Sequence, residues 1–210
     1  MYAARENLLQ GMKSTEFMSP PSFGFDLMRT AVLGLAIEHA FVRPLINPRQ
    51  TQAVRYAQST LNGPSVGEFG AGPAPGCVAD ECAITLFGDA GLREGHLTDF
   101  LEPRFNALCF TEKGAIPKGL GPLERTLQAS GIPFRLVVLS RERPSHGSSF
   151  VAWDHTGRLF PMYGATPGTV YLIRPDGHVL ARWRHATPEN VDSAIERTLH
   201  ASSSQSKESA

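Results

Sequence analysis

The middle of the chain alternates short apolar runs with a helical pattern. The runs at 104–110 and 134–139 predict buried strands, and the segment 120–130 between them predicts a helix that ends at Gly131. A strand, a helix and a second strand in this order form a βαβ unit, which is parallel and right-handed in nearly all proteins. We therefore expect an α/β fold in this part of the chain.

The last third of the chain continues the same alternation. Residues 158–163 predict a short helical piece, and the runs 169–173 and 178–183 predict two antiparallel strands joined by a Pro-Asp-Gly turn. The Thr-Pro pair at 187–188 is a start signal for a final helix, whose apolar positions recur at helical spacing. The polar residues 201–210 predict a disordered tail.

The N-terminal part contains one strongly apolar helical pattern, at 25–42. Apolar side chains recur there at the i, i+3, i+4 spacing and also occupy the opposite side. Such a helix is normally covered on both sides, so we infer a missing partner or a missing part of a larger protein. The order of residues 1–24 stays open. The Pro- and Gly-rich stretch 43–83 predicts a connector and a loop, with room for a helical turn in 51–61.

The element order β-α-β, helix, β-β, helix is that of the thioredoxin-like fold. We expect this fold over 63–200, preceded by a helical segment and connector over 1–62 and followed by the tail. Thr166 and Pro167 lie just before the third expected strand, where thioredoxins carry a cis-proline. This makes the Thr166–Pro167 bond a candidate cis peptide, although only about 5–6% of such bonds are cis in folded proteins.

Composition narrows the classes of function. Lys and Arg total 20, as do Asp and Glu, so a formal net charge of zero gives no global case for binding nucleic acid or an acidic membrane. The N-terminus lacks the apolar region of a signal peptide. The apolar stretch 31–37 is far shorter than the roughly 20 residues that span a bilayer. We expect a soluble cytoplasmic protein that binds neither nucleic acid nor membrane.

Three cysteines are too few for a disulfide-stabilised secreted scaffold. The turn after the first expected strand, 111–114, lacks the Cys-x-x-Cys pair that a helix N-terminus would activate. Cys109 lies within that strand and is predicted to be an inert core thiol. Cys77 and Cys82 have a spacing that allows a redox pair or half of a metal site, but no second half-site follows. A thiol-dependent redox protein remains the weakest of the alternatives.

Other motifs in the sequence give weaker indications of a binding or catalytic site. The stretch 70–76 has the glycines of a dinucleotide fingerprint, but its spacing is wrong and no strand precedes it, so we interpret it as a linker. Residues 145–149 place Ser beside His in a surface loop without the setting of a nucleophile elbow. Arg182 and Arg184 share a strand face, which favours a solvated face over an anion-binding or partner-facing edge. No metal-binding spacing occurs among the histidines, which are His39, His96, His146, His155, His178, His185 and His200.

The stretch 163–183, Tyr-Gly-Ala-Thr-Pro-Gly-Thr-Val-Tyr-Leu-Ile-Arg-Pro-Asp-Gly-His-Val-Leu-Ala-Arg-Trp, closely resembles part of a known family. It is similar to the C-terminal thioredoxin-like domain of FAD-dependent aromatic hydroxylases of the phenol hydroxylase and hydroxyphenylpropionate hydroxylase type. The resemblance extends over roughly residues 25–200. Further similar segments are 72–76, 97–99, the strand that contains Phe105, and the preceding helix and connector at 25–28, 48–50 and 56–62.

The resemblance implies an FAD-, NADPH- and oxygen-dependent parent enzyme. In that family the FAD-binding motifs lie upstream of this domain, and only Gly88–Gly91 faintly resembles one of them here. We therefore expect no catalytic, cofactor-binding or metal-binding residue in this chain. The family's C-terminal domain lacks the redox cysteines and is implied to serve packing and dimer contacts. The first hypothesis is thus a non-catalytic module that packs on a second copy or on a flavoprotein chain, whether it is a truncated gene product or a separate piece. The alternative is one subunit of a split FAD/NADPH-dependent hydroxylase.

Overall fold

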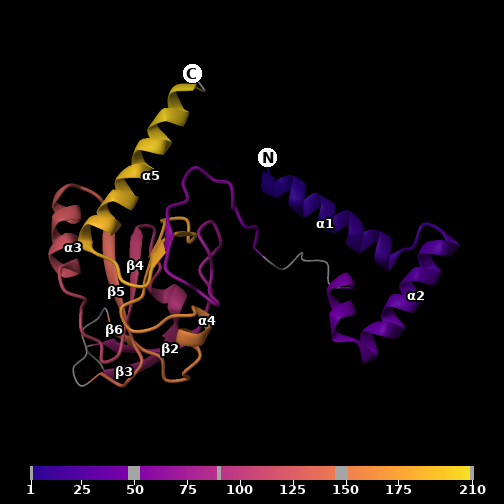
Figure 1. Cartoon of the computed structure of the whole chain (residues 1–210), viewed down its shortest axis with the longest axis horizontal. Helices are drawn as coiled ribbons and strands as arrows, with labels where there is room; N and C mark the ends of the chain where they lie inside the picture. Colours follow the sequence, from indigo (N-terminus) through magenta and orange to yellow (C-terminus); the bar gives the residue numbers. More distant parts are fainter. Residues whose placement is uncertain (1, 47–52, 89–90, 145–150, 209–210) are drawn as a thin grey trace. The chain divides into compact units, whose positions relative to one another are not determined.

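The chain forms two compact units, Met1–Val54 and Arg55–Ala210, in a computed structural model that describes residues 2–46, 53–88, 91–144 and 151–208 (Figure 1). The first unit begins with α1 (Tyr2–Met18) and continues with α2 (Phe23–Glu38) and the 3-10 helix η1 (Ala40–Leu45). Ser22 caps α2, because its hydroxyl accepts a hydrogen bond from the Phe25 N–H. No described helix is both long and apolar enough to cross a membrane.

The second unit is built on one mixed eight-stranded sheet. The strands are β1 (Ser65–Val66), β2 (Ala83–Gly88), β3 (Gly91–His96), β4 (Phe105–Thr111), β5 (Phe134–Ser140), β6 (Val151–Trp153), β7 (Val170–Ile173) and β8 (Val179–Trp183). Their order across the sheet is β1-β8-β7-β4-β5-β6-β2-β3. The helical elements are η3 (Leu97–Phe100), α3 (Leu120–Ala129), α4 (Leu159–Met162) and α5 (Pro188–Glu208).

The predicted α/β pattern is confirmed at the centre of the sheet. Strands β4 and β5 are parallel and are joined by α3. This helix ends just before Gly131, whose backbone is in the left-handed conformation (φ 79°). Strands β7 and β8 are antiparallel and are joined by the predicted turn. Strand β7 also pairs antiparallel with β4, so the sheet is mixed. The predicted short helix near 158–163 is α4, and the predicted final helix is α5.

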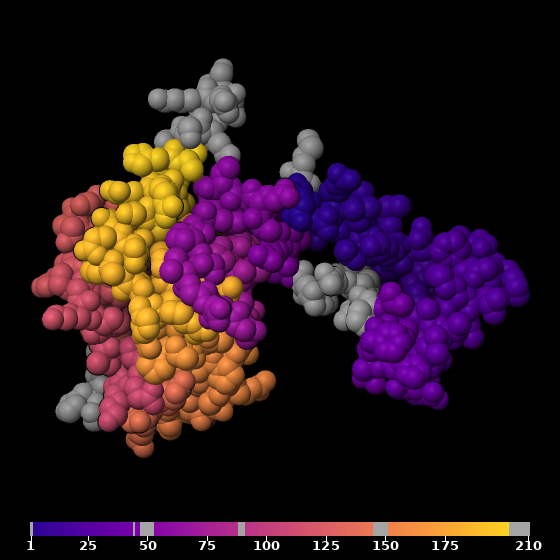
Figure 2. Space-filling model, in the orientation of Figure 1, coloured from indigo at the N-terminus to yellow at the C-terminus, as the bar shows by residue number. Residues whose placement is uncertain are grey.

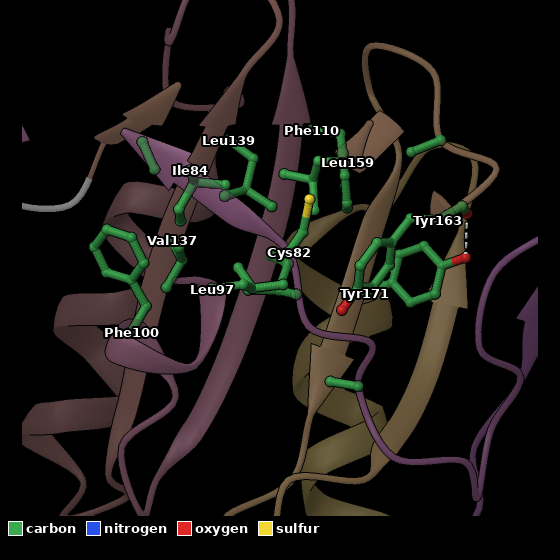
Figure 3. Packing of buried hydrophobic residues seen from close by; sticks show 14 of the residues in the cluster. Cys82, Ile84, Leu97, Phe100, Phe110, Val137, Leu139, Leu159, Tyr163 and Tyr171 are labelled. Carbon is green, nitrogen blue, oxygen red and sulfur yellow. Dashed lines mark hydrogen bonds between the residues drawn. The ribbon is translucent and has the colours of Figure 1, made fainter. Parts of the chain in front are cut away.

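The sheet is covered on both faces, and its strand residues alternate between two cores. Every residue of β4 is buried. Leu108 and Phe110 point into a cluster that also contains residues of α4 and η3. Ala107 and Cys109 point into a second cluster, with residues of α3 and α5. This two-sided burial explains why β4 and β5 read as continuous apolar runs in the sequence. Figure 3 shows part of the first cluster.

Three parts of the fold differ from the sequence-based expectation or lie beyond it. Residues 2–18 form α1, where the order of the N-terminal residues was open. Strands β2 and β3 pair antiparallel from Ala83 with His96 to Gly88 with Gly91 and form a β2–β3 hairpin that the sequence analysis did not predict. Helix α5 continues through Glu208 rather than ending at a disordered tail from 201. Extending an existing helix costs far less than nucleating one, which lets a capped helix run on into polar sequence.

The prediction of a cis bond at Thr166–Pro167 is wrong, since every described peptide bond is trans. Thr169 donates its N–H to the Thr166 carbonyl at 2.9 Å, and Gly168 has φ of 98°. This hydrogen bond encloses Pro167 and Gly168, and a proline followed by a glycine at positive φ is typical of a type II turn. The turn also exchanges two backbone hydrogen bonds with Phe110, by which it is held against β4.

Candidate functional site

The three cysteines are free, and the two that lie in the core, Cys82 and Cys109, lack the surroundings of a reactive thiol. Cys109 is fully buried, and burial raises the pKa of its thiol to about 12. The sulfur of Cys82 lies inside the first core cluster (Figure 3), and burial, followed by the charge of Asp154, raises its pKa. Cys77 is half-buried. An activated cysteine needs a lowered pKa, so Cys82 and Cys109 act as core residues.

The turn at 111–114, where a redox pair would be expected, has a structural hydrogen-bond network instead. The Thr111 hydroxyl accepts the Gly114 N–H at 3.0 Å and donates to the Leu139 carbonyl at 3.3 Å. On the neighbouring strand the Ser140 hydroxyl is directed at the Glu112 and Glu142 carbonyls. These contacts hold the ends of β4 and β5 together and leave no hydroxyl directed outward as a nucleophile.

Arg182 and Arg184 both stack on the ring of Phe69. Their guanidinium carbons lie 4.3 and 4.2 Å from the centre of its ring, which is within the range of cation–π attraction. We call these three residues the Arg–Phe–Arg stack. The residues were predicted to lie on a solvated face, with an anion-binding or partner-facing edge as the alternative.

The guanidinium donors of the Arg–Phe–Arg stack are used inside the molecule. Arg182 donates to the Ser65 hydroxyl at 2.8 Å and to the Gly72 carbonyl at 3.0 Å. Arg184 donates to the Glu68 carbonyl at 2.8 Å and to the Gly164 carbonyl at 2.6 Å. The two arginines therefore fasten the Gly-rich segment 63–76 to β8.

Two buried tyrosines, Tyr163 and Tyr171, continue from the Arg–Phe–Arg stack into the core (Figure 3). Their rings meet edge to face with centres 5.0 Å apart. The Tyr171 hydroxyl donates to the Tyr163 carbonyl at 2.6 Å, and the Tyr163 hydroxyl donates to the Asp80 carbonyl at 2.7 Å. Burial raises the pKa of both hydroxyls. Both tyrosines are therefore protonated structural donors.

The β7–β8 turn holds a buried arginine. The Arg174 side chain is 7% exposed and forms two hydrogen bonds to Asp176, at 3.1 and 2.6 Å. Its Nη1 is buried without a hydrogen-bond partner among the described residues. Burial tends to raise the pKa of the 54% exposed Asp176, but hydrogen bonds from Arg174 and from the His178 N–H outweigh it, so that the pKa is lowered. This ion pair orders the turn and was missed from sequence because Arg and Asp two residues apart in a turn give no distinctive pattern.

Large apolar side chains project from α2 and η1 in the first unit, whose surface is indigo and violet in Figure 2. Phe23, Ile37 and Phe41 are 82%, 79% and 81% exposed. Leu27, Met28, Leu35 and Leu45 are also exposed, while Ala36 is the only buried residue of α2. Exposed apolar surface on this scale is characteristic of interaction sites. We call it the α2–η1 surface.

No family model and no curated protein sequence matches the chain, but solved structures do. The chain has a TM-score of 0.54 and 18% identity to aklavinone-11 hydroxylase, solved with FAD and aklavinone, over 73% of this chain and 27% of that one. It has a TM-score of 0.50 and 17% identity to the flavin-dependent monooxygenase PieE, solved with FAD and substrate, over 87% of this chain and 31% of that one.

The chain shares its fold with parts of flavin-dependent monooxygenases. It spans less than a third of the length of either of these two proteins, and at this identity the likeness establishes the fold alone. Both of these neighbouring proteins were solved with FAD.

The last candidates from the sequence are the histidines and the segments 145–149 and 88–91. No group of three or more potential ligands could hold a metal ion within the part of the chain that the structure describes. His155 contacts the Thr85 hydroxyl at 2.8 Å through Nδ1, and His178 contacts the Tyr56 ring. The Ser–His segment at 145–149 lies outside the described residues, as do Asp89 and Ala90 of the Gly88–Gly91 segment.

Proposed function

We propose that this chain is a non-catalytic, thioredoxin-like module of the FAD-dependent aromatic monooxygenase type. Its α2–η1 surface would dock on a chain or chain segment that carries the flavin site. The module would position and stabilise that partner rather than react with substrate, FAD or NADPH. The proposal includes a cytoplasmic location, in which the three free cysteines would stay reduced.

The exposed apolar side chains of α2 and η1 carry this proposal. Complete burial of one large apolar side chain contributes roughly 1.5–3 kcal/mol, so leaving nine of them in water is costly. A helix whose apolar side chains lie on several sides suits docking into an apolar groove. The fold neighbours are several times longer than this chain, which supports a partner that supplies the missing cover.

The arrangement of the second unit supports the thioredoxin-like assignment. The parallel β4–α3–β5 unit, the antiparallel strands β7 and β8, and the final helix α5 follow that fold's order. A catalytic thioredoxin would carry two cysteines after its first strand, whereas this chain has Thr111 there and a core thiol at Cys109. Binding and packing are the functions that such a domain retains without its thiols.

Flavin titration tests the proposal directly. We expect the purified full-length chain to lack visible flavin absorbance and to leave FAD fluorescence unchanged as protein is added. We also expect no oxidation of NADPH with phenolic substrates. Stoichiometric quenching of FAD fluorescence would contradict the non-catalytic assignment, and a flavin spectrum in the purified protein would contradict it independently.

The split enzyme is the alternative, and the α2–η1 surface favours it equally. In that case the chain mixed with an FAD-bearing partner would raise the partner's NADPH-dependent hydroxylation. A variant with Ile37→Glu and Phe41→Glu should lose that stimulation, while Leu92→Glu, an exposed substitution on β3, should retain it. Stimulation that survives the α2–η1 substitutions would contradict docking through this surface.

A further inference from the structure

We draw no further inference here: the strongest candidate, the buried side-chain cluster around Arg174 at the β7–β8 turn, belongs to the ion pair with Asp176 already described, and nothing in the structure shows what would contact its buried Nη1.

Discussion

A buried guanidinium at the end of β7 depends on one partly exposed carboxylate. Arg174 is almost inaccessible, and its described ion-pair partner is Asp176, which lies in the turn that follows. An ionised side chain in such a place is stable only while its partner is charged. The ionisation state of Asp176 therefore sets the stability of the turn.

The pKa of Asp176 is lowered in the folded protein from the ordinary value of 3.8. The ionised Asp176 therefore stabilises the folded protein fully above pH 3.8. This stabilisation is lost as the pH falls through the lower pKa that Asp176 has in the folded state. We expect Asp176→Asn to destabilise the protein by about 1–3 kcal/mol at neutral pH, because Arg174 then lacks a charged partner. The difference should shrink as both proteins are titrated below 3.8 in urea unfolding experiments.

Glu142→Gln is a suitable control, since Glu142 is exposed and its carboxylate has no described partner. Its unfolding free energy should differ little from that of the natural chain at any of these pH values. A destabilisation by Asp176→Asn that persists unchanged in acid would show that the amide disturbs the turn itself rather than the ion pair.

At the scale of single elements, the Arg–Phe–Arg stack joins segment 63–76 to β8. Phe69→Ala removes the ring that both guanidinium groups contact, and each group gains about 0.5–1 kcal/mol or more from this contact. We expect a loss of about 1–3 kcal/mol in unfolding free energy. Amide hydrogen exchange should rise across 63–76 while β4 and β5 stay protected.

Val66→Ala provides the comparison within the same segment, because Val66 is 50% exposed. It should change exchange much less than Phe69→Ala. Equal exchange in the two variants would mean that the backbone bonds between β1 and β8, and not the ring, hold the segment.

The elements that sequence patterns predicted are those with strong local signals. Strands β4 and β5 are uniformly buried and therefore uniformly apolar, and α5 has its Thr-Pro start. The β2–β3 hairpin escaped notice because β3 is an exposed edge strand, whose polar residues show no alternation. The stack escaped because the acceptors of Arg182 and Arg184 are backbone carbonyls from distant segments. At Thr166–Pro167 the analogy with thioredoxins predicts a cis bond, whereas Pro followed by Gly favours the type II turn that the structure has.

At the scale of the whole molecule, the two units differ in how they bury apolar surface. Unit Arg55–Ala210 contains both core clusters, whereas the first unit leaves most of its large apolar side chains exposed. A domain with its own core can fold alone. We expect residues 55–210 to unfold cooperatively as an isolated fragment and to be more soluble than the full chain.

Thermal unfolding and light scattering of the fragment check this expectation. A shorter deletion of residues 1–45 should already improve solubility, because it removes most of the exposed apolar side chains. A longer deletion of residues 1–66 should be less stable, because it also removes β1 and the bond from the Gly63 N–H to the Leu180 carbonyl. A non-cooperative 55–210 fragment would show that the first unit contributes to the core.

The two edge strands of the sheet, β1 and β3, affect whether copies of the chain can associate by adding strands to the sheet. Strand β1 is only two residues long, and β3 presents Arg93 and Glu94 to solvent. Short or charged margins resist the sideways addition of further strands, the first step toward fibrils. Crowding this protein should therefore yield clusters with unchanged strand content, which disperse in mild detergent and do not bind amyloid dyes.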